Sequence, residues 1–138
     1  MAAIAPKLAL LLAATAFATQ ADQAQDVLRA VSRISTALTD NNPSDAMTPF
    51  DKSTPGYTTL ESEFASLTNA YSIANEIQVL DEGDSPTETR LTLRWSLNLT
   101  NVQSSASTRK TSEVHVRLRL EKKKWKIVEF SPVDFFMP

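Results

Sequence analysis

Residues 90–99 read Arg-Leu-Thr-Leu-Arg-Trp-Ser-Leu-Asn-Leu, and every second side chain in this stretch is apolar. Side chains of a β-strand point alternately to the two faces of a sheet, so the stretch predicts a strand with one dry face and one wet face. The alternation returns in residues 114–120 and, less cleanly, in residues 125–130. This pattern favours an antiparallel sheet with one face on a core and the other in water.

Polar links separate these runs and predict how the strands connect. Residues 121–124 (Glu-Lys-Lys-Lys) suit a hairpin between the last two strands, although no glycine fixes its turn type. Residues 101–110, rich in Ser and Thr, predict a longer hairpin loop. A weaker strand is expected at residues 73–80, before the turn-forming residues 81–86. We therefore expect four antiparallel strands in sequence.

The first half of the chain carries helical spacing instead. Apolar residues recur at helical intervals in one segment: Val27, Leu28, Val31, Ile34, Ala37 and Leu38. A short second helix is expected at residues 43–47. Helices followed by a meandering sheet predict an α+β domain with the helices on the dry face of the sheet.

A further helix is expected to begin at Thr58 or Thr59, either of which can cap it. Glu61 and Glu63 suit the positive N-terminal end of this helix. Its apolar face is predicted from four residues with helical spacing: Leu60, Phe64, Leu67 and Tyr71.

Composition limits the classes of protein. A chain of 138 residues suits one domain, and its net charge of -2 gives no sign of nucleic-acid binding. The chain has no cysteine, which excludes disulfides, thiolate metal sites and a cysteine nucleophile.

The N-terminus has the features of a signal peptide. Lys7 precedes the apolar run 8–14, and Ala16-Phe17-Ala18 fits the small-x-small rule of signal peptidase. Cleavage after Ala18 or Ala21 would leave a mature domain of residues 22–138, either periplasmic or secreted. The apolar run is short for a membrane span. An uncleaved anchor or an ordinary first helix are the alternatives.

The order of elements and the C-terminus resemble the nuclear transport factor 2-like (NTF2-like, SnoaL-like) superfamily. Residues 124–130 resemble its last strand with a Trp-x-Ile pattern, and residues 131–136 and 50–57 are similar to small exported bacterial members of unknown function. The resemblance implies a cystatin-like α+β cone around a cavity, which enzymes of the family line with carboxylates, histidines or tyrosines. Residues 51–56 are too short for the small hairpin of many members, so we expect a cavity that is more open there.

Few residues of this chain could do chemistry in such a cone. The predicted dry face carries no ionisable group, as expected of a plain core. Asp134, in an apolar tail that could fold over the cavity mouth, is the sole catalytic candidate, with a turn or cap as the alternative. The ligand-pocket candidates are Tyr57, Phe64, Tyr71, Trp95, Leu97, Val116 and Asp134.

The predicted wet face is basic. It carries Arg90, Arg94, Arg117, Arg119 and Lys126, with Glu76, Glu113, Glu121 and Glu129 as partial counter-charges. A solvated face, a surface for an acidic partner and a homodimer interface all fit. His115, the one histidine, is expected on this face, and no metal-ligand spacing or cofactor motif accompanies it.

The leading functional hypothesis is an exported, non-catalytic domain that binds a small apolar ligand or a protein partner. The first alternative is an enzyme of the SnoaL or ketosteroid-isomerase type that uses acid-base groups at the mouth of the cone. The second is a structural subunit of an envelope complex.

Overall fold

The structure is a computed structural model that describes the backbone of residues 4–138 and the side chains of residues 22–138. The predicted signal peptide, residues 1–21, lies outside the part with described side chains. As far as their described residues go, the helices include none long and apolar enough to cross a membrane.

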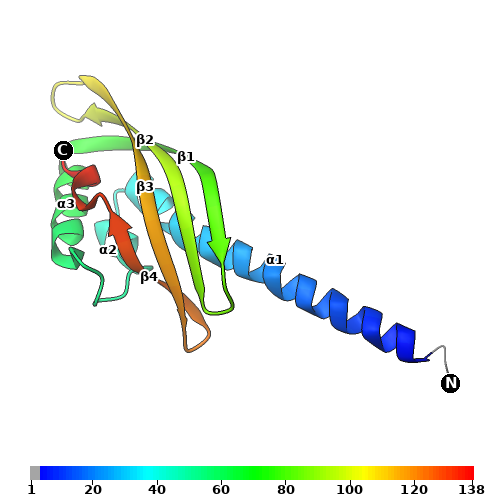
Figure 1. Ribbon diagram of the computed structural model, residues 1–138. Helices are drawn as coiled ribbons and strands as arrows, with labels where there is room; N and C mark the ends of the chain where they lie inside the picture. Colours follow the sequence, from blue (N-terminus) through cyan, green and yellow to red (C-terminus); the bar gives the residue numbers. More distant parts are fainter. Residues whose placement is uncertain (1–3) are drawn as a thin grey trace.

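Three helices precede the sheet, and a short 3-10 helix follows it (Figure 1). The elements in order are α1 (Ile4–Thr39), α2 (Pro43–Ala46), α3 (Tyr57–Ala70), β1 (Tyr71–Asp84), β2 (Glu88–Asn101), β3 (Ser107–Glu121), β4 (Lys124–Ser131) and η1 (Val133–Phe136). The four strands form one antiparallel sheet in the order β1-β2-β3-β4. The predicted α+β class and the meandering sheet are confirmed.

The two faces of the sheet follow the alternation of the sequence. The apolar residues of β2, from Leu91 to Leu99, are all buried, and their neighbours Arg90 and Arg94 are exposed. In the register, Leu91 lies opposite Val116 and Leu93 opposite Val114, so the dry residues of adjacent strands share one face. That face packs on Val27, Val31, Ile34 and Leu38 of α1 and Leu60, Phe64 and Leu67 of α3.

Several predicted boundaries are wrong. β1 was expected to end at residue 80 but continues to Asp84. Its polar end is held by backbone pairing with β2 in an exposed hairpin, which needs no apolar side chains. The loop expected at residues 101–110 is shorter, since residues 107–110 pair with β2. Leu28, expected on the apolar face of the helix, is 37% exposed, because it lies beside the buried stripe and not within it.

The start of α3 also differs from the prediction. Gly56 and not Thr58 or Thr59 caps it, with φ +78° and no side-chain hydrogen bond. A Cβ atom at Gly56 would lie 2.7 Å from Val133 Cγ1, so glycine serves both the left-handed backbone and the close approach of the tail. The β3–β4 turn has positive φ at Lys122 and Lys123, as a type I′ hairpin requires, although neither is glycine.

The outer edge of β4 is covered by the segment before α3. Phe50 forms an isolated parallel bridge with Ile127, and the Thr54 hydroxyl donates to the Ile127 carbonyl at 2.7 Å. Residues 51–56 were expected to be too short for the small hairpin of many superfamily members. In the described chain this segment covers the edge of β4 without forming a hairpin. Lys126, predicted on the wet face, instead reaches over this edge and donates to the Thr48 carbonyl at 2.9 Å. The register shift between Arg117 and Leu118 breaks the alternation of β4 nearby.

Candidate functional site

The C-terminal tail fills the space between α3 and the sheet. Phe135 and Phe136 of η1 are 2% and 0% exposed. The Phe136 ring centroid lies 4.8 Å from that of Phe64 and 5.3 Å from that of Trp95. The ring of Phe130 on β4 is stacked on Phe136 at 5.5 Å. A ligand could therefore enter the interior of the cone only where these rings give way.

The structure brings some of the predicted pocket residues together. Phe64 and Trp95 meet around Phe136, and Leu97 and Val116 are buried in the same core. Trp95 donates its indole N–H to Asn75 Oδ1 at 2.9 Å, so its polar atom is already satisfied within the core. These four residues are therefore packed core residues in this structure.

The structure does not gather the polar pocket candidates, Tyr57, Tyr71 and Asp134, into one site. Tyr57 is the first residue of α3 and Tyr71 follows its last, so about 20 Å of helix separates the two. Both tyrosines are half-buried against the core. Asp134 lies in η1 and is exposed.

Glu63 is the buried carboxylate of the described residues, and it is not among the site residues predicted from the sequence. Glu63 lies three residues after Leu60 and four before Leu67, so helical spacing places it on the apolar face of α3. Its side chain is only 6% exposed. Neither of its carboxylate oxygens has a hydrogen-bond partner among the described residues. The spacing was visible in the sequence, but the residue was interpreted as a helix-dipole charge.

Burial dominates the electrostatics of Glu63. Loss of hydration raises the pKa of the Glu63 carboxyl, and the nearby Asp134 charge raises it further. The positive charge of Lys110 lowers the pKa of the Glu63 carboxyl, but by less. A carboxyl group with a raised pKa in a recess is a common feature of functional sites.

A hollow of about 400 Å³ lies over Glu63, between α3 and the end of the tail. Its lining consists of Thr58, Thr59, Ser62, Glu63, Ser66, Met137 and Pro138. Met137, at the rim of this hollow, is 54% exposed. Glu63 thus lines this hollow beside the last two residues of the chain.

Lys110 of β3 fastens the tail above this hollow. Its ammonium group donates to the Met137 carbonyl at 2.8 Å and lies 5.7 Å from the centroid of the Phe135 ring. The candidate site thus combines hydroxyl groups, the apolar side chains of Met137 and Pro138, and a buried hydrogen-bond acceptor. It can receive an amine or another hydrogen-bond donor.

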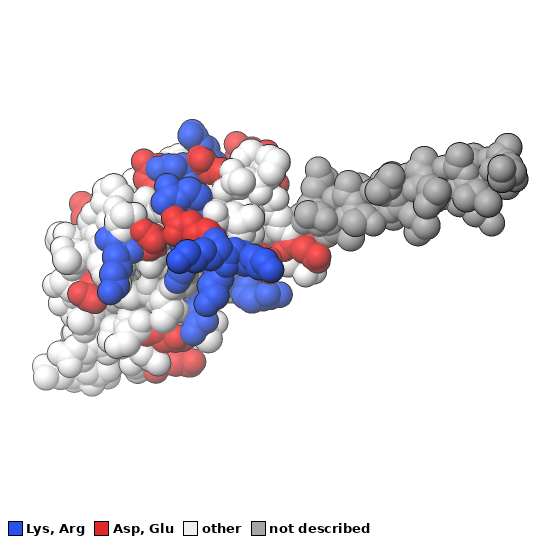
Figure 2. All heavy atoms as spheres, turned by 90° about the horizontal axis from the view of Figure 1, so that it is seen from below, with Lys and Arg blue, Asp and Glu red and all other residues white. Residues whose placement is uncertain are grey.

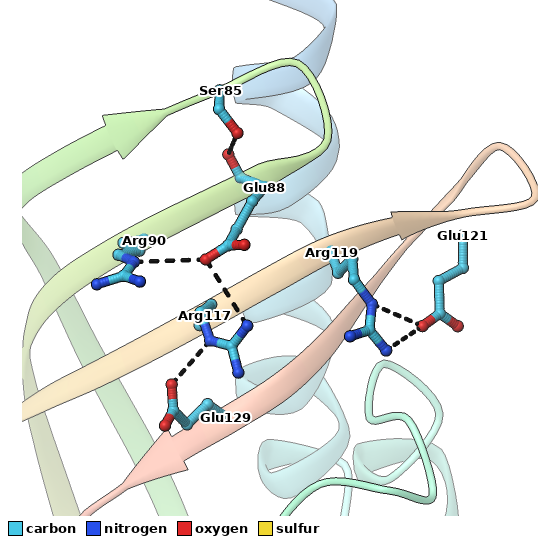
Figure 3. A network of polar contacts seen from close by, with 7 residues as sticks. All are labelled: Ser85, Glu88, Arg90, Arg117, Arg119, Glu121 and Glu129. Atoms are coloured by element: carbon cyan, nitrogen blue, oxygen red, sulfur yellow. Dashed lines mark hydrogen bonds and ion pairs between the residues drawn. The ribbon is translucent and has the colours of Figure 1, made fainter.

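The outer face of the sheet has a different character. Figure 3 shows Glu88 between Arg90 and Arg117, and a second ion pair joins Arg117 Nε to Glu129 at 2.8 Å. Arg119 pairs with Glu121 at 2.5 Å. The hydrogen bond from Arg117 to Glu129 raises the pKa of the arginine. The partial charge balance that the sequence predicts on this face is present.

His115 lies on the exposed face, as predicted, with its Nε2 3.6 Å from Glu113 Oε1. Within the described part of the chain, no three His, Asp or Glu side chains gather as metal ligands would.

This arrangement of helices against one face of a curved antiparallel sheet defines an α+β cone. Neither a protein-family model nor a curated protein matches the sequence. Solved structures do match, and they show that the chain has the NTF2-like fold.

Three of these structures illustrate the likeness. A scytalone dehydratase-like protein from Novosphingobium aromaticivorans is 10% identical with a TM-score of 0.72, over 83% of this chain and 85% of that one. An NTF2-like superfamily protein from Salmonella enterica is 8% identical with a TM-score of 0.61, over 77% and 86%. An NTF2-like protein of unknown function from Shewanella oneidensis is 8% identical with a TM-score of 0.63, over 78% and 96%.

Proposed function

We propose that the protein is an exported, non-catalytic binding domain whose small ligand enters the hollow between α3 and the C-terminal tail. The observation that carries this proposal is Glu63, a buried carboxylate whose oxygens have no hydrogen-bond partner among the described residues. A buried charge without a partner is costly, so it favours a role for Glu63 outside stability.

The surroundings of Glu63 define the chemistry of the ligand. Phe64 and Phe136, which neighbour Glu63 and Met137 in sequence, are buried in the adjacent core, and Met137 at the rim of the hollow gives a displaceable apolar cover. A ligand with a mostly apolar body and one amine or other donor would satisfy both parts of the site. Its donor would pair with Glu63, and its body would replace the side chain of Met137 and, in a deeper pose, that of Phe136.

The first test is native mass spectrometry of the protein purified from an exported fraction. We expect an adduct of a few hundred daltons, lost in Glu63→Gln and kept in Glu61→Gln. Glu61 is a matched control because it lies on the same helix and is exposed. A clean mass together with an envelope protein captured by crosslinking would contradict the proposal and support the structural-subunit alternative.

A second test uses defined probes. Phenethylamine should raise the melting temperature of the wild type and of Glu61→Gln, because it binds the folded state alone. Propylbenzene, which has a similar shape without the charge, should give a smaller shift. Equal shifts from both compounds would exclude Glu63 as the receiving group.

A second candidate function is acid-base catalysis, and the raised pKa of Glu63 favours it. In that case Glu63 would exchange a proton with the substrate, and Asp134 would act on the pKa of Glu63 through its charge. If Asp134 is itself a catalytic group, Asp134→Asn should abolish turnover with little change in melting temperature. The bound molecule distinguishes the two functions: a binding domain releases it unchanged, whereas an enzyme converts it.

A further inference from the structure

A second hollow lies between α1 and the β3–β4 hairpin. It has a volume of about 450 Å³. Its lining consists of Asp26, Arg29, Ala30, Arg33, Thr48, Pro49, Lys123, Lys124, Trp125 and Lys126. Five of the fourteen basic residues of the chain thus line one groove, with one carboxylate among them. The gathering is local, because the chain as a whole carries a net charge of -2.

The basic side chains form two walls. Arg29 and Arg33 lie one turn apart on α1, and three lysines lie on the hairpin and β4. Figure 2 shows Lys and Arg side chains gathered on this lower face of the molecule. Positive walls on the two sides of the groove repel one another, and an anion between them would relieve that repulsion.

The charges of the groove are available to a ligand. Arg29 pairs with Asp26 at 3.2 Å and Arg33 with Asp45 at 2.9 Å, but all four side chains are more than a third exposed. Exposed pairs of this kind are weak and exchange readily for a better partner. Lys123 and Lys124 form no ion pair with any described residue, and both are exposed.

The groove also has an apolar part. Pro49 is buried, and Ala30 and Trp125 are half-buried along the lining. The volume is that of a small-molecule site. The guanidinium groups of Arg29 and Arg33 can each give two parallel hydrogen bonds to a phosphate, and the indole of Trp125 can pack on an aromatic ring.

We infer that this groove binds a small organic phosphate. The phosphate lies between the arginines of α1 and the lysines of the hairpin, and the apolar body of the ligand packs on Trp125. A recess suits a soluble phosphate ester better than a flat membrane, whose headgroups would meet the rims of the groove. This site is separate from the hollow at Glu63, and the inference stands independently of the proposed function.

The test is an NMR titration of the full chain with phenyl phosphate at low salt, read at the two indole N–H signals. Trp125 lines the groove, whereas Trp95 is fully buried and bonded to Asn75, so it serves as a reference in the same spectrum. We expect a saturable shift of the Trp125 signal, weakened by added salt, and an unmoved Trp95 signal. Benzyl alcohol, which lacks the phosphate, should leave both signals in place.

A pair of variants shows whether the groove or the overall charge binds the probe. Arg29→Gln/Lys124→Gln removes one charge from each wall and should raise the Kd about tenfold, since each loses a charge-assisted hydrogen bond. Arg90→Gln/Arg94→Gln removes two exposed charges from the outer sheet face and should change the Kd by less than about twofold.

Three outcomes would overturn the inference. In the first, phenyl phosphate leaves the Trp125 signal unmoved. In the second, the two double variants weaken the binding of phenyl phosphate equally, which would show that the net charge of the protein attracts the probe and the groove does not. In the third, the protein ignores phenyl phosphate and sediments with phosphatidylglycerol vesicles, which would assign the groove to a lipid surface.

Discussion

Glu63 and Glu129 are both glutamates of one small domain, yet their surroundings are opposite. Glu129 lies on the outer sheet face, exposed, with the Arg117 guanidinium 2.8 Å away. Glu63 lies under the C-terminal tail, 6% exposed, without a hydrogen-bond partner among the described residues. A paired charge on the surface has little effect on the free energy of unfolding, whereas a buried charge without a partner lowers it. The difference directs the search for function to the tail and away from the ion pairs of the sheet.

The largest expected effect concerns the packing around Glu63. Phe136→Ala should lower the free energy of unfolding by about 3–5 kcal/mol, because it removes a buried ring and leaves a cavity. Met137→Ala, at a 54% exposed neighbour, should change it little. Urea unfolding measures both. A small loss for Phe136→Ala would mean that the tail does not fill the cone.

The second effect has the opposite sign. Glu63→Leu should stabilise the protein at neutral pH by about 1–3 kcal/mol, because it removes an unsatisfied buried group from an apolar face. Glu61→Leu, on the exposed face of the same helix, should lack this gain. The same Glu63→Leu variant should lose the ligand. If it is destabilised instead, Glu63 has a structural partner and the comparison with Glu129 fails.

The pH dependence of stability sharpens the contrast. Because folding raises the pKa of Glu63, the folded state holds this proton more tightly than the unfolded state. The contribution of Glu63 is therefore fully present below the unfolded value of about 4.3 and is lost as the pH rises through the raised folded value. Thermal unfolding from acid to neutral pH should show a steeper loss in the wild type than in Glu63→Gln. Parallel curves would contradict the raised pKa.

The smallest effect is expected on the outer face. Arg117→Gln and Glu129→Gln should each change the free energy of unfolding by about 0–1 kcal/mol, with a coupling that salt reduces. A double-mutant cycle measures that coupling. A coupling as large as the effect of Glu63→Leu would show that the outer network is a principal source of stability.

Arg117→Ser/Arg119→Ser addresses the proposal that this face forms a homodimer. Sedimentation velocity should show weaker self-association of the double variant if the face is an interface. Unchanged sedimentation would favour a solvated face.

The sequence predicted the sheet well because alternation is a local signal. The dry residues of β2 and β3 and the exposed His115 are where period-two spacing places them. The extent of β1 was underestimated because residues 81–84 are polar and were interpreted as a turn. Their strand conformation comes from pairing with β2, which is a tertiary contact and leaves no apolar pattern.

The candidate site was harder to predict. The cap at Gly56 depends on the approach of Val133, more than seventy residues later in the chain. The apolar tail residues Phe135 and Phe136 are visible in the sequence, but the sequence does not show that they fill the interior of the cone. Glu63 did carry a signal, since it shares the helical face of Leu60 and Leu67. The sequence could not show that Glu63 is buried, because its burial depends on the tertiary packing of the C-terminal segment against α3.

The most direct measurement is an NMR titration of the Glu63 side-chain carboxyl carbon, without and with phenethylamine. We predict a midpoint above the usual glutamate value of about 4.3 in the free protein. The midpoint should fall when the amine is added, because a positive partner favours the carboxylate. A midpoint at the usual value that phenethylamine leaves unchanged would contradict the assignment of Glu63 as the buried group that receives the ligand.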